Sequence, residues 1–301
     1  MQRVLSFLVM VGFGTATLAA CGTVDHERDV GVLAYSGLGA WVDVYDYAPA
    51  FQENAASPRV LPESVDDMAD LGVQTLYLQA GFTDPRAPED DVVDRDLVEQ
   101  FVERARTHEI AVVAWYLPRL GDLDADLRLV GALAEFEHEG EGFDSIALDI
   151  EWTADVPEVE ARNAALIELS QRARDLVGDG VLGAIVFPPV QTEVVNPALW
   201  PDFPWQEVEP LYDVWLPMAY WTFRDGEFRD AYRYVAESVR RLRANLGDPE
   251  AVVHAIGGLA DTTTPADLDD LRRAVRDEQL IGWSLYDYDI TPSSLWPRLR
   301  F

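Results

Sequence analysis

The stretch Ser145-Ile-Ala-Leu-Asp-Ile-Glu, residues 145–151, decides the predicted fold. It is an almost continuous apolar run that ends in two acids, which is typical of a parallel strand covered on both faces. Similar runs rich in Val, Ile, Leu, Ala and Trp occur at residues 40–45, 73–79, 110–116, 181–187, 214–220, 251–256 and 280–285. The chain therefore contains eight predicted strands.

Helical patterns separate these runs. The clearest covers residues 228–246, where apolar residues recur on one face before Gly247 and Pro249 end the helix. Between the fifth and sixth runs, prolines predict a loop with at most one short helix. The alternation predicts an α/β fold, a single-domain (β/α)8 TIM barrel over residues 40–301. An open doubly wound sheet is the alternative, but no Gly-x-Gly-x-x-Gly follows the first run.

The composition excludes several classes of function. The chain of 301 residues has 54 Asp and Glu against 23 basic residues, a net charge of −31. This charge repels phosphate backbones, so nucleic acid is not an expected partner. The absence of lysine excludes Schiff-base chemistry. A single cysteine and four histidines without ligand spacing exclude zinc sites and disulfides, and we expect no metal and no cofactor.

The N-terminus has the layout of a secretory signal peptide over residues 1–20, with an apolar run followed by small residues. Leu18-Ala-Ala-Cys21 resembles the bacterial lipobox, in which the cysteine is lipidated. We therefore expect a monomer held to the outer face of a cell membrane only by a lipid on Cys21, with residues 21–39 as a stalk. The alternatives are an ordinary signal peptide with a coincidental cysteine, or a short membrane anchor.

Acids and aromatic residues gather where the predicted strands end, at the rim that carries the active sites of TIM barrels. Flat rings stack on sugars and acids protonate glycosidic oxygens, so the combination indicates a carbohydrate ligand. Asp149 and Glu151 lie two residues apart and face one side of their strand, while Leu148 and Ile150 face the helices. Repulsion between two such acids raises one pKa, as a general acid requires. The structural alternative is that both acids only cap the strand end.

These residues resemble family 18 of the glycoside hydrolases, the chitinase-like barrels. Asp144-Ser-Ile-Ala147-Leu-Asp149-Ile-Glu151 matches the family signature Asp-x-x-Asp-x-Asp-x-Glu except at Ala147. A second match to the family is Met218-Ala-Tyr220-Trp221, which is similar to Met-x-Tyr-Asp/Asn but has Trp221 in place of the last polar residue. A third is Gly282-Trp283-Ser-Leu with Asp287 and Asp289, which is similar to a Trp-Ser-x-Asp run.

The resemblance implies hydrolysis of a β-linked, N-acetylated polysaccharide or oligosaccharide. It makes Glu151 the general acid, Asp149 the residue that orients the acetamido group and Tyr220 a hydrogen-bond donor to that group. The substrate would supply its own nucleophile. The expected substrate-binding residues are Trp283 as the floor of the sugar pocket, with Asp43, Trp115, Met218, Trp221 and Asp287.

Three alternatives remain open. Ala147 and Trp221 remove polar groups, so a second carboxylate from Asp43, Asp46 or Asp287 could act as base or nucleophile. The pair Asp43-Val-Tyr45 and Asp149-Ile-Glu151 also looks like the acidic motifs of family 25 lysozymes, which act on peptidoglycan. Finally, the barrel could bind glycans without cleaving them.

His254 lies inside an apolar run and is expected to be an ordinary core histidine.

Overall fold

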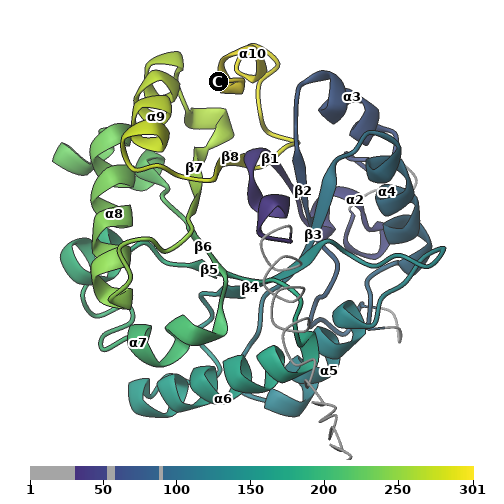
Figure 1. Cartoon of the computed structure of the whole chain (residues 1–301), viewed down its shortest axis with the longest axis horizontal. Helices are drawn as coiled ribbons and strands as arrows, with labels where there is room; N and C mark the ends of the chain where they lie inside the picture. Colours follow the sequence, from purple (N-terminus) through teal and green to yellow (C-terminus); the bar gives the residue numbers. More distant parts are fainter. Residues whose placement is uncertain (1–30, 53–57, 88–90) are drawn as a thin grey trace, which may run out of the picture.

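The computed structural model describes residues 31–52, 58–87 and 91–301. Eight parallel strands lie in the order β6-β5-β4-β3-β2-β1-β8-β7. Parallel bridges from Trp215 to Val253 and from Met218 to Ile256 join β6 to β7 and close the ring (Figure 1). The strands are β1 (Gly37–Val42), β2 (Thr75–Gln79), β3 (Ala111–Tyr116), β4 (Ser145–Ile150), β5 (Leu182–Val186), β6 (Val214–Pro217), β7 (His254–Leu259) and β8 (Gly282–Tyr286). The predicted (β/α)8 barrel is confirmed.

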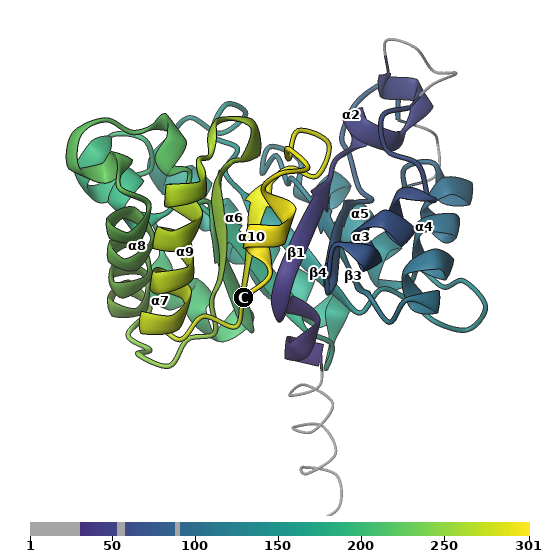
Figure 2. The ribbon, with the colours of Figure 1, turned by 90° about the horizontal axis from the view of Figure 1, so that it is seen from above.

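Helices surround the strands, as Figure 1 shows. They are α2 (Val44–Tyr47), α3 (Ser64–Asp70), α4 (Arg95–Thr107), α5 (Leu123–Ala134), α6 (Val159–Val177), α7 (Trp205–Val208), α8 (Ala231–Leu246), α9 (Pro265–Asp277) and α10 (Trp296–Leu299). Figure 2 shows α8 and α9 on one side of the strands and α3 and α4 on the other. The clearest predicted helix is α8, which begins where the Asp230 side chain accepts the Arg233 amide and ends at Gly247 with φ 74°. The predicted loop between β5 and β6 holds α7 and two further helical turns, η3 (Gln191–Val195) and η4 (Glu209–Leu211), which is more helix than expected.

The core has two layers because each strand buries both faces. One layer fills the barrel and includes Trp41, Tyr77, Trp115 and Ala147. The other lies between strands and helices and includes Ile146, Leu148 and Ile150. Thus β4 directs Ser145, Ala147 and Asp149 inward, and Leu148 and Ile150 face the helices as predicted.

The folded domain begins earlier than predicted. Tyr35, in the turn η1 (Leu33–Tyr35), has no exposed surface, and its hydroxyl contacts Ser145 Oγ at 2.7 Å. β1 starts at Gly37, where φ is 73°. Residues 31–39 therefore belong to the barrel rather than to a stalk. The first strand also ends early, since Asp43 caps α2.

The predicted signal peptide of residues 1–20 and Cys21 lie outside the described residues. Among the residues that the structure describes, none of the helices combines the length and the apolar character needed to cross a bilayer.

His254 lies at the centre of a buried polar chain inside the barrel. Its Nδ1 donates to the Tyr35 carbonyl oxygen at 2.9 Å, so its Nε2 accepts from Ser284 Oγ, also at 2.9 Å. Ser284 Oγ in turn accepts from Trp41 Nε1 at 2.8 Å. Burial lowers the pKa of His254 to about 4, so the ring is neutral near pH 7. The prediction of a core histidine is confirmed, and its role is to hold Trp41 through Ser284.

Candidate active site

The end of β4 brings two acids to the C-terminal mouth of the barrel, the region bordered by Asp43, Asp149, Glu151, Tyr220 and Tyr286. Asp149 is only 8% exposed, and its buried Oδ1 has no hydrogen-bond partner among the residues that the structure describes. Glu151 lies just beyond the strand and is more exposed. An acid that only capped the strand would have its buried oxygen satisfied by backbone amides. The unpartnered Oδ1 therefore points to a group that arrives from outside the chain.

Both acids hold protons more tightly than ordinary carboxyl groups. Burial raises the pKa of Asp149 well above its usual value, and the neighbouring charge of Glu151 raises it further. Burial also raises the pKa of Glu151. Two acids so close release their protons as a pair, so one proton stays on the pair at a pH where isolated carboxyl groups are ionised. The pair thus has the property that the sequence predicts for a general acid.

Tyr220 follows β6 and faces the same mouth. Burial raises the pKa of its phenol, and the charges of Asp149, Glu151 and Asp287 raise it further. The phenol is therefore neutral and can donate a hydrogen bond. Its ring lies 6.2 Å from that of Tyr286 on β8, measured between centroids. Tyr220 therefore links the acids of β4 to the residues at the end of β8.

A second group of acids, the β1–β8 acid cluster, consists of Asp43, Asp46 and Asp287. One carboxylate oxygen from each lies within 4.8 Å of the others. Arg59 binds Asp46 at 3.0 Å and Asp289 at 2.8 Å. Burial and nearby acids raise the pKa of Asp46 to about 8. Burial raises the pKa of Asp287 to about 6.

Most oxygens of the β1–β8 acid cluster already have donors. The donors are Tyr45 N and Tyr286 Oη to Asp43, Arg59 and Asp43 N to Asp46, and Ile290 N to Asp287. A cation would need these oxygens as ligands. The arrangement therefore fits a hydrogen-bonded wall of the mouth better than a metal centre.

Aromatic rings form the floor of the mouth. Trp41 stacks on Tyr77 with centroids 4.2 Å apart and meets Trp115 edge-on at 5.9 Å. The buried Trp115 Nε1 has no partner within the described part of the chain, and Met218 contributes to the same inner layer. The structure thus brings Asp149, Glu151, Tyr220 and Asp287 close together at the C-terminal end of the barrel, with Asp43 next to Tyr286 and with Trp115 and Met218 in the inner layer.

Trp283 and Trp221 lie elsewhere, which corrects two sequence predictions. Because Ser284 points into the barrel, Trp283 points outward, where its Nε1 donates to Leu299 O and its ring stacks on Phe301 at 4.3 Å. Trp221 is fully buried in the outer layer and packs on Gly257 and Gly258. Neither side chain can touch a ligand in the mouth, so Trp283 does not floor the pocket and Trp221 does not bind substrate.

Sequence reasoning missed Trp41 and Tyr286 as residues of the mouth. Trp41 is not among the substrate-binding residues that the sequence predicts, and its place next to Ser284 follows from the pairing of β1 with β8. Ala147 lies on the inner face two residues before Asp149. The site therefore lacks an acid at the inward position where the family 18 signature has one.

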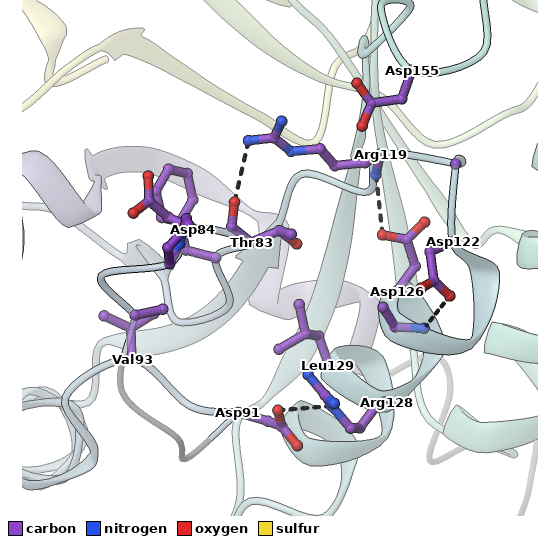
Figure 3. Close-up of a pocket in the computed structure, with 15 residues that line it drawn as sticks. Thr83, Asp84, Asp91, Val93, Arg119, Asp122, Asp126, Arg128, Leu129 and Asp155 are labelled. Carbon is purple, nitrogen blue, oxygen red and sulfur yellow. Dashed lines mark hydrogen bonds and ion pairs between the residues drawn. The ribbon is translucent and has the colours of Figure 1, made fainter.

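A large hollow lies at the same rim of the barrel, and Figure 3 draws the residues that line it. Its volume is 1190 Å³, and the loops after β2 and β3, the start of α5 and Asp155 form its wall. We call it the groove. Its lining includes Phe82, Thr83, Asp84, Arg119, Ala125 and Asp155.

Comparison with known proteins supports the fold. No protein-family model and no curated protein matches this chain. The PgaB (BpsB) glycoside hydrolase domain from Bordetella bronchiseptica is similar, with a TM-score of 0.59, 15% identity, and coverage of 88% of this chain and 99% of that one. A GH18 chitinase from Pseudoalteromonas aurantia has a TM-score of 0.58 and 14% identity, over 87% of this chain and 97% of that one.

The spore cortex-lytic enzyme SleL from Bacillus megaterium QM B1551 has a TM-score of 0.58 and 9% identity, over 88% of this chain and 73% of that one. At such identities, the similarity establishes the barrel architecture alone.

Proposed function

We propose that this protein is a glycoside hydrolase that cleaves a β-linked, N-acetylated polysaccharide with Glu151 as the general acid. The observation that carries the proposal is the Asp149–Glu151 pair, which has raised pKa values and one unpartnered oxygen in a mouth floored by Trp41 and Trp115. Several similar structures are glycoside hydrolases, among them a chitinase and the PgaB domain, and this supports the reaction class.

Each residue of the mouth has a part in the proposed reaction. Glu151 is the more exposed acid of the pair, so it gives its proton to the glycosidic oxygen as the bond to the anomeric carbon breaks. Asp149 and the neutral phenol of Tyr220 hold the acetamido group, whose oxygen attacks the anomeric carbon. Water then opens this intermediate, and the ionised Glu151 accepts the proton of that water. The configuration of the sugar is retained.

A second mechanism uses a carboxylate from the β1–β8 acid cluster in place of the acetamido group. Ala147 favours it, because an acid of the family 18 signature is absent there. Asp287 is the strongest candidate, because Ile290 N donates to its Oδ1 and none of the described residues donates to its Oδ2. Sugars without an acetamido group would then be cleaved as well.

The test measures release of product from fluorogenic chitobiosides, purified peptidoglycan, mannan and β-glucan. Glu151→Gln should lower kcat by about 10²–10⁴-fold, the usual contribution of a general acid. Glu160→Gln, at the exposed start of α6, is the matched control and should leave kcat unchanged. Turnover that survives Glu151→Gln contradicts the proposal. Glycan binding without turnover by the unaltered protein supports the non-catalytic alternative, and cleavage of peptidoglycan alone supports the lysozyme-like one.

We also propose that the chain is a lipoprotein on the outer face of the cell membrane, on the basis of Leu18-Ala-Ala-Cys21. Cells that express the protein should incorporate labelled palmitate into it, and Cys21→Ala should abolish the label. Label that persists in this variant contradicts lipidation at Cys21.

A further inference from the structure

The groove begins beside the proposed general acid. Trp152 directly follows Glu151, and the guanidinium of Arg119 lies 4.3 Å from the centroid of the Trp152 ring. Arg119 also donates to the carbonyl oxygen of Thr83 at 3.2 Å, across to the loop after β2 (Figure 3). Arg119 belongs to the groove wall, so the residue that follows Glu151 contacts this wall.

The size of the groove suits several sugar units. Pockets for small molecules usually have volumes of about 300–1,000 Å³. The groove, at 1190 Å³, exceeds this range, and its wall comes from the loops after β2 and β3, the start of α5 and Asp155. Its wall offers the ring of Phe82, hydroxyl and carbonyl groups of Thr83, and the carboxylate of Asp155, which can stack on sugars or accept their hydroxyl protons.

The charge of the groove limits the ligand. Its wall carries the acids Asp84, Asp91, Asp122, Asp126 and Asp155 against the bases Arg119 and Arg128. Arg128 is bound to Asp91 at 2.9 Å. The excess of acids, on a chain with a net charge of −31, repels glycans that carry carboxylates or sulfates.

We propose that the groove binds several units of a glycan chain without anionic groups, so that the enzyme cleaves inside long chains. This rests on the proposed function for the cleavage step, whereas binding in the groove can be tested separately. Uncharged chains and amine-bearing chains both lack anionic groups, and the experiment distinguishes between them.

The experiment measures binding by calorimetry in Glu151→Gln, which prevents turnover. The probes contain two or six units of N-acetylglucosamine, glucosamine, glucose or mannose, with oligogalacturonides as the anionic comparison. We expect at least one of the uncharged or amine-bearing hexamers to bind more tightly than its dimer. Oligogalacturonides should bind more weakly than that hexamer.

Two additional substitutions locate the binding. Ala125→Trp fills the groove from α5 and should reduce hexamer affinity about tenfold while leaving dimer affinity unchanged, because only the distal sugars lose contacts. Ala134→Trp, at the exposed end of the same helix and outside the groove wall, is the matched control and should change neither. Asp155→Arg, at an exposed position, should weaken binding of the glucosamine hexamer more than that of the acetylated one.

The outcomes separate the two proposals. Equal affinity for dimer and hexamer, no binding of any uncharged or amine-bearing probe, or unchanged hexamer binding in folded Ala125→Trp overturns the groove site. If Ala125→Trp does not fold, two measurements still test whether the groove binds glycans. They are the comparison of dimer with hexamer affinity and the effect of Asp155→Arg. Length-dependent binding without turnover by the unaltered protein supports the groove and contradicts the proposed hydrolase.

Discussion

The Asp149–Glu151 pair and the β1–β8 acid cluster lie at the same rim and are both partly withdrawn from water, yet their surroundings differ. Asp149 has a buried oxygen to which none of the described residues donates. In the cluster, backbone amides, Arg59 and the Tyr286 hydroxyl satisfy most oxygens of Asp43 and Asp46. Burial raises pKa values in both groups. A raised pKa alone therefore does not identify a catalytic acid. What distinguishes Asp149 is a carboxyl oxygen that is free to bind a ligand.

The sharpest test compares Asp149→Asn with Asp287→Asn. We expect Asp149→Asn to lower kcat by about 10²-fold or more, because it removes a group that holds the reacting acetamido oxygen. Asp287→Asn should lower kcat less than about tenfold, because Asp287 forms part of the wall of the mouth and does not contact the reacting atoms in the proposed mechanism. Both are measured as initial rates on whichever glycan the unaltered protein cleaves in the assay of product release. An equal loss in Asp287→Asn would break the comparison and favour a second catalytic carboxylate.

The next largest effect concerns two tryptophans. The sequence predicts Trp283 as the floor of the pocket, whereas the structure places Trp41 there. Trp41→Phe should raise KM several-fold, because it alters the floor and removes the hydrogen bond to Ser284. Trp283→Phe should leave KM unchanged and lower the free energy of unfolding by about 1 kcal/mol through loss of the bond to Leu299. Steady-state kinetics and urea unfolding separate these effects. A raised KM in Trp283→Phe would return that residue to the site.

The pH dependence of stability tests the β1–β8 acid cluster. The pKa of Asp46 rises from 3.8 to about 8 on folding, so the folded state binds more protons between these values. Stability from this residue is therefore fully present below pH 3.8 and is lost as pH rises toward 8, with a slope of up to about 1.4 kcal/mol per pH unit for one proton.

Asp46→Asn should remove this contribution and flatten the decline of stability between pH 5 and pH 8, as measured by urea unfolding at several pH values. An unchanged slope would mean that Asp46 is already ionised in the folded state and that Arg59 outweighs its burial.

The smallest effect comes from salt, which distinguishes exposed acids from buried ones. Raising ionic strength from about 0.1 to 1 M shortens the screening length from about 10 to 3 Å. Repulsion within a chain of net charge −31 then weakens, so Tm should rise by a few degrees. The alkaline limb of kcat against pH, set by Asp149 and Glu151, should move little because buried pairs are poorly screened. A large shift of that limb would mean that the pair is open to solvent.

The sequence predicted the site on β4 better than the rest of the mouth. Period-two alternation predicted that Asp149 and Glu151 share one face and that Leu148 and Ile150 face the helices, and the structure confirms the second placement. The same alternation could not orient β8, because both faces of a strand in a parallel barrel are apolar. From the sequence, either Trp283 or Ser284 could point inward. The hydrogen bonds of Ser284 with His254 and Trp41 show that Ser284 is the inward residue.

The sequence by itself determined the alternation of strands and helices, hence the barrel, because hydrophobic periodicity and helix caps are local properties. It also determined the strong negative charge and the position of an acid pair at a strand end. Only the tertiary structure decided that Asp43 and Asp287 share a wall, since closing the ring pairs β1 with β8 across most of the chain. It also decided that loops after β2 and β3 enclose a groove, because such contacts depend on the distance between segments in space rather than along the sequence.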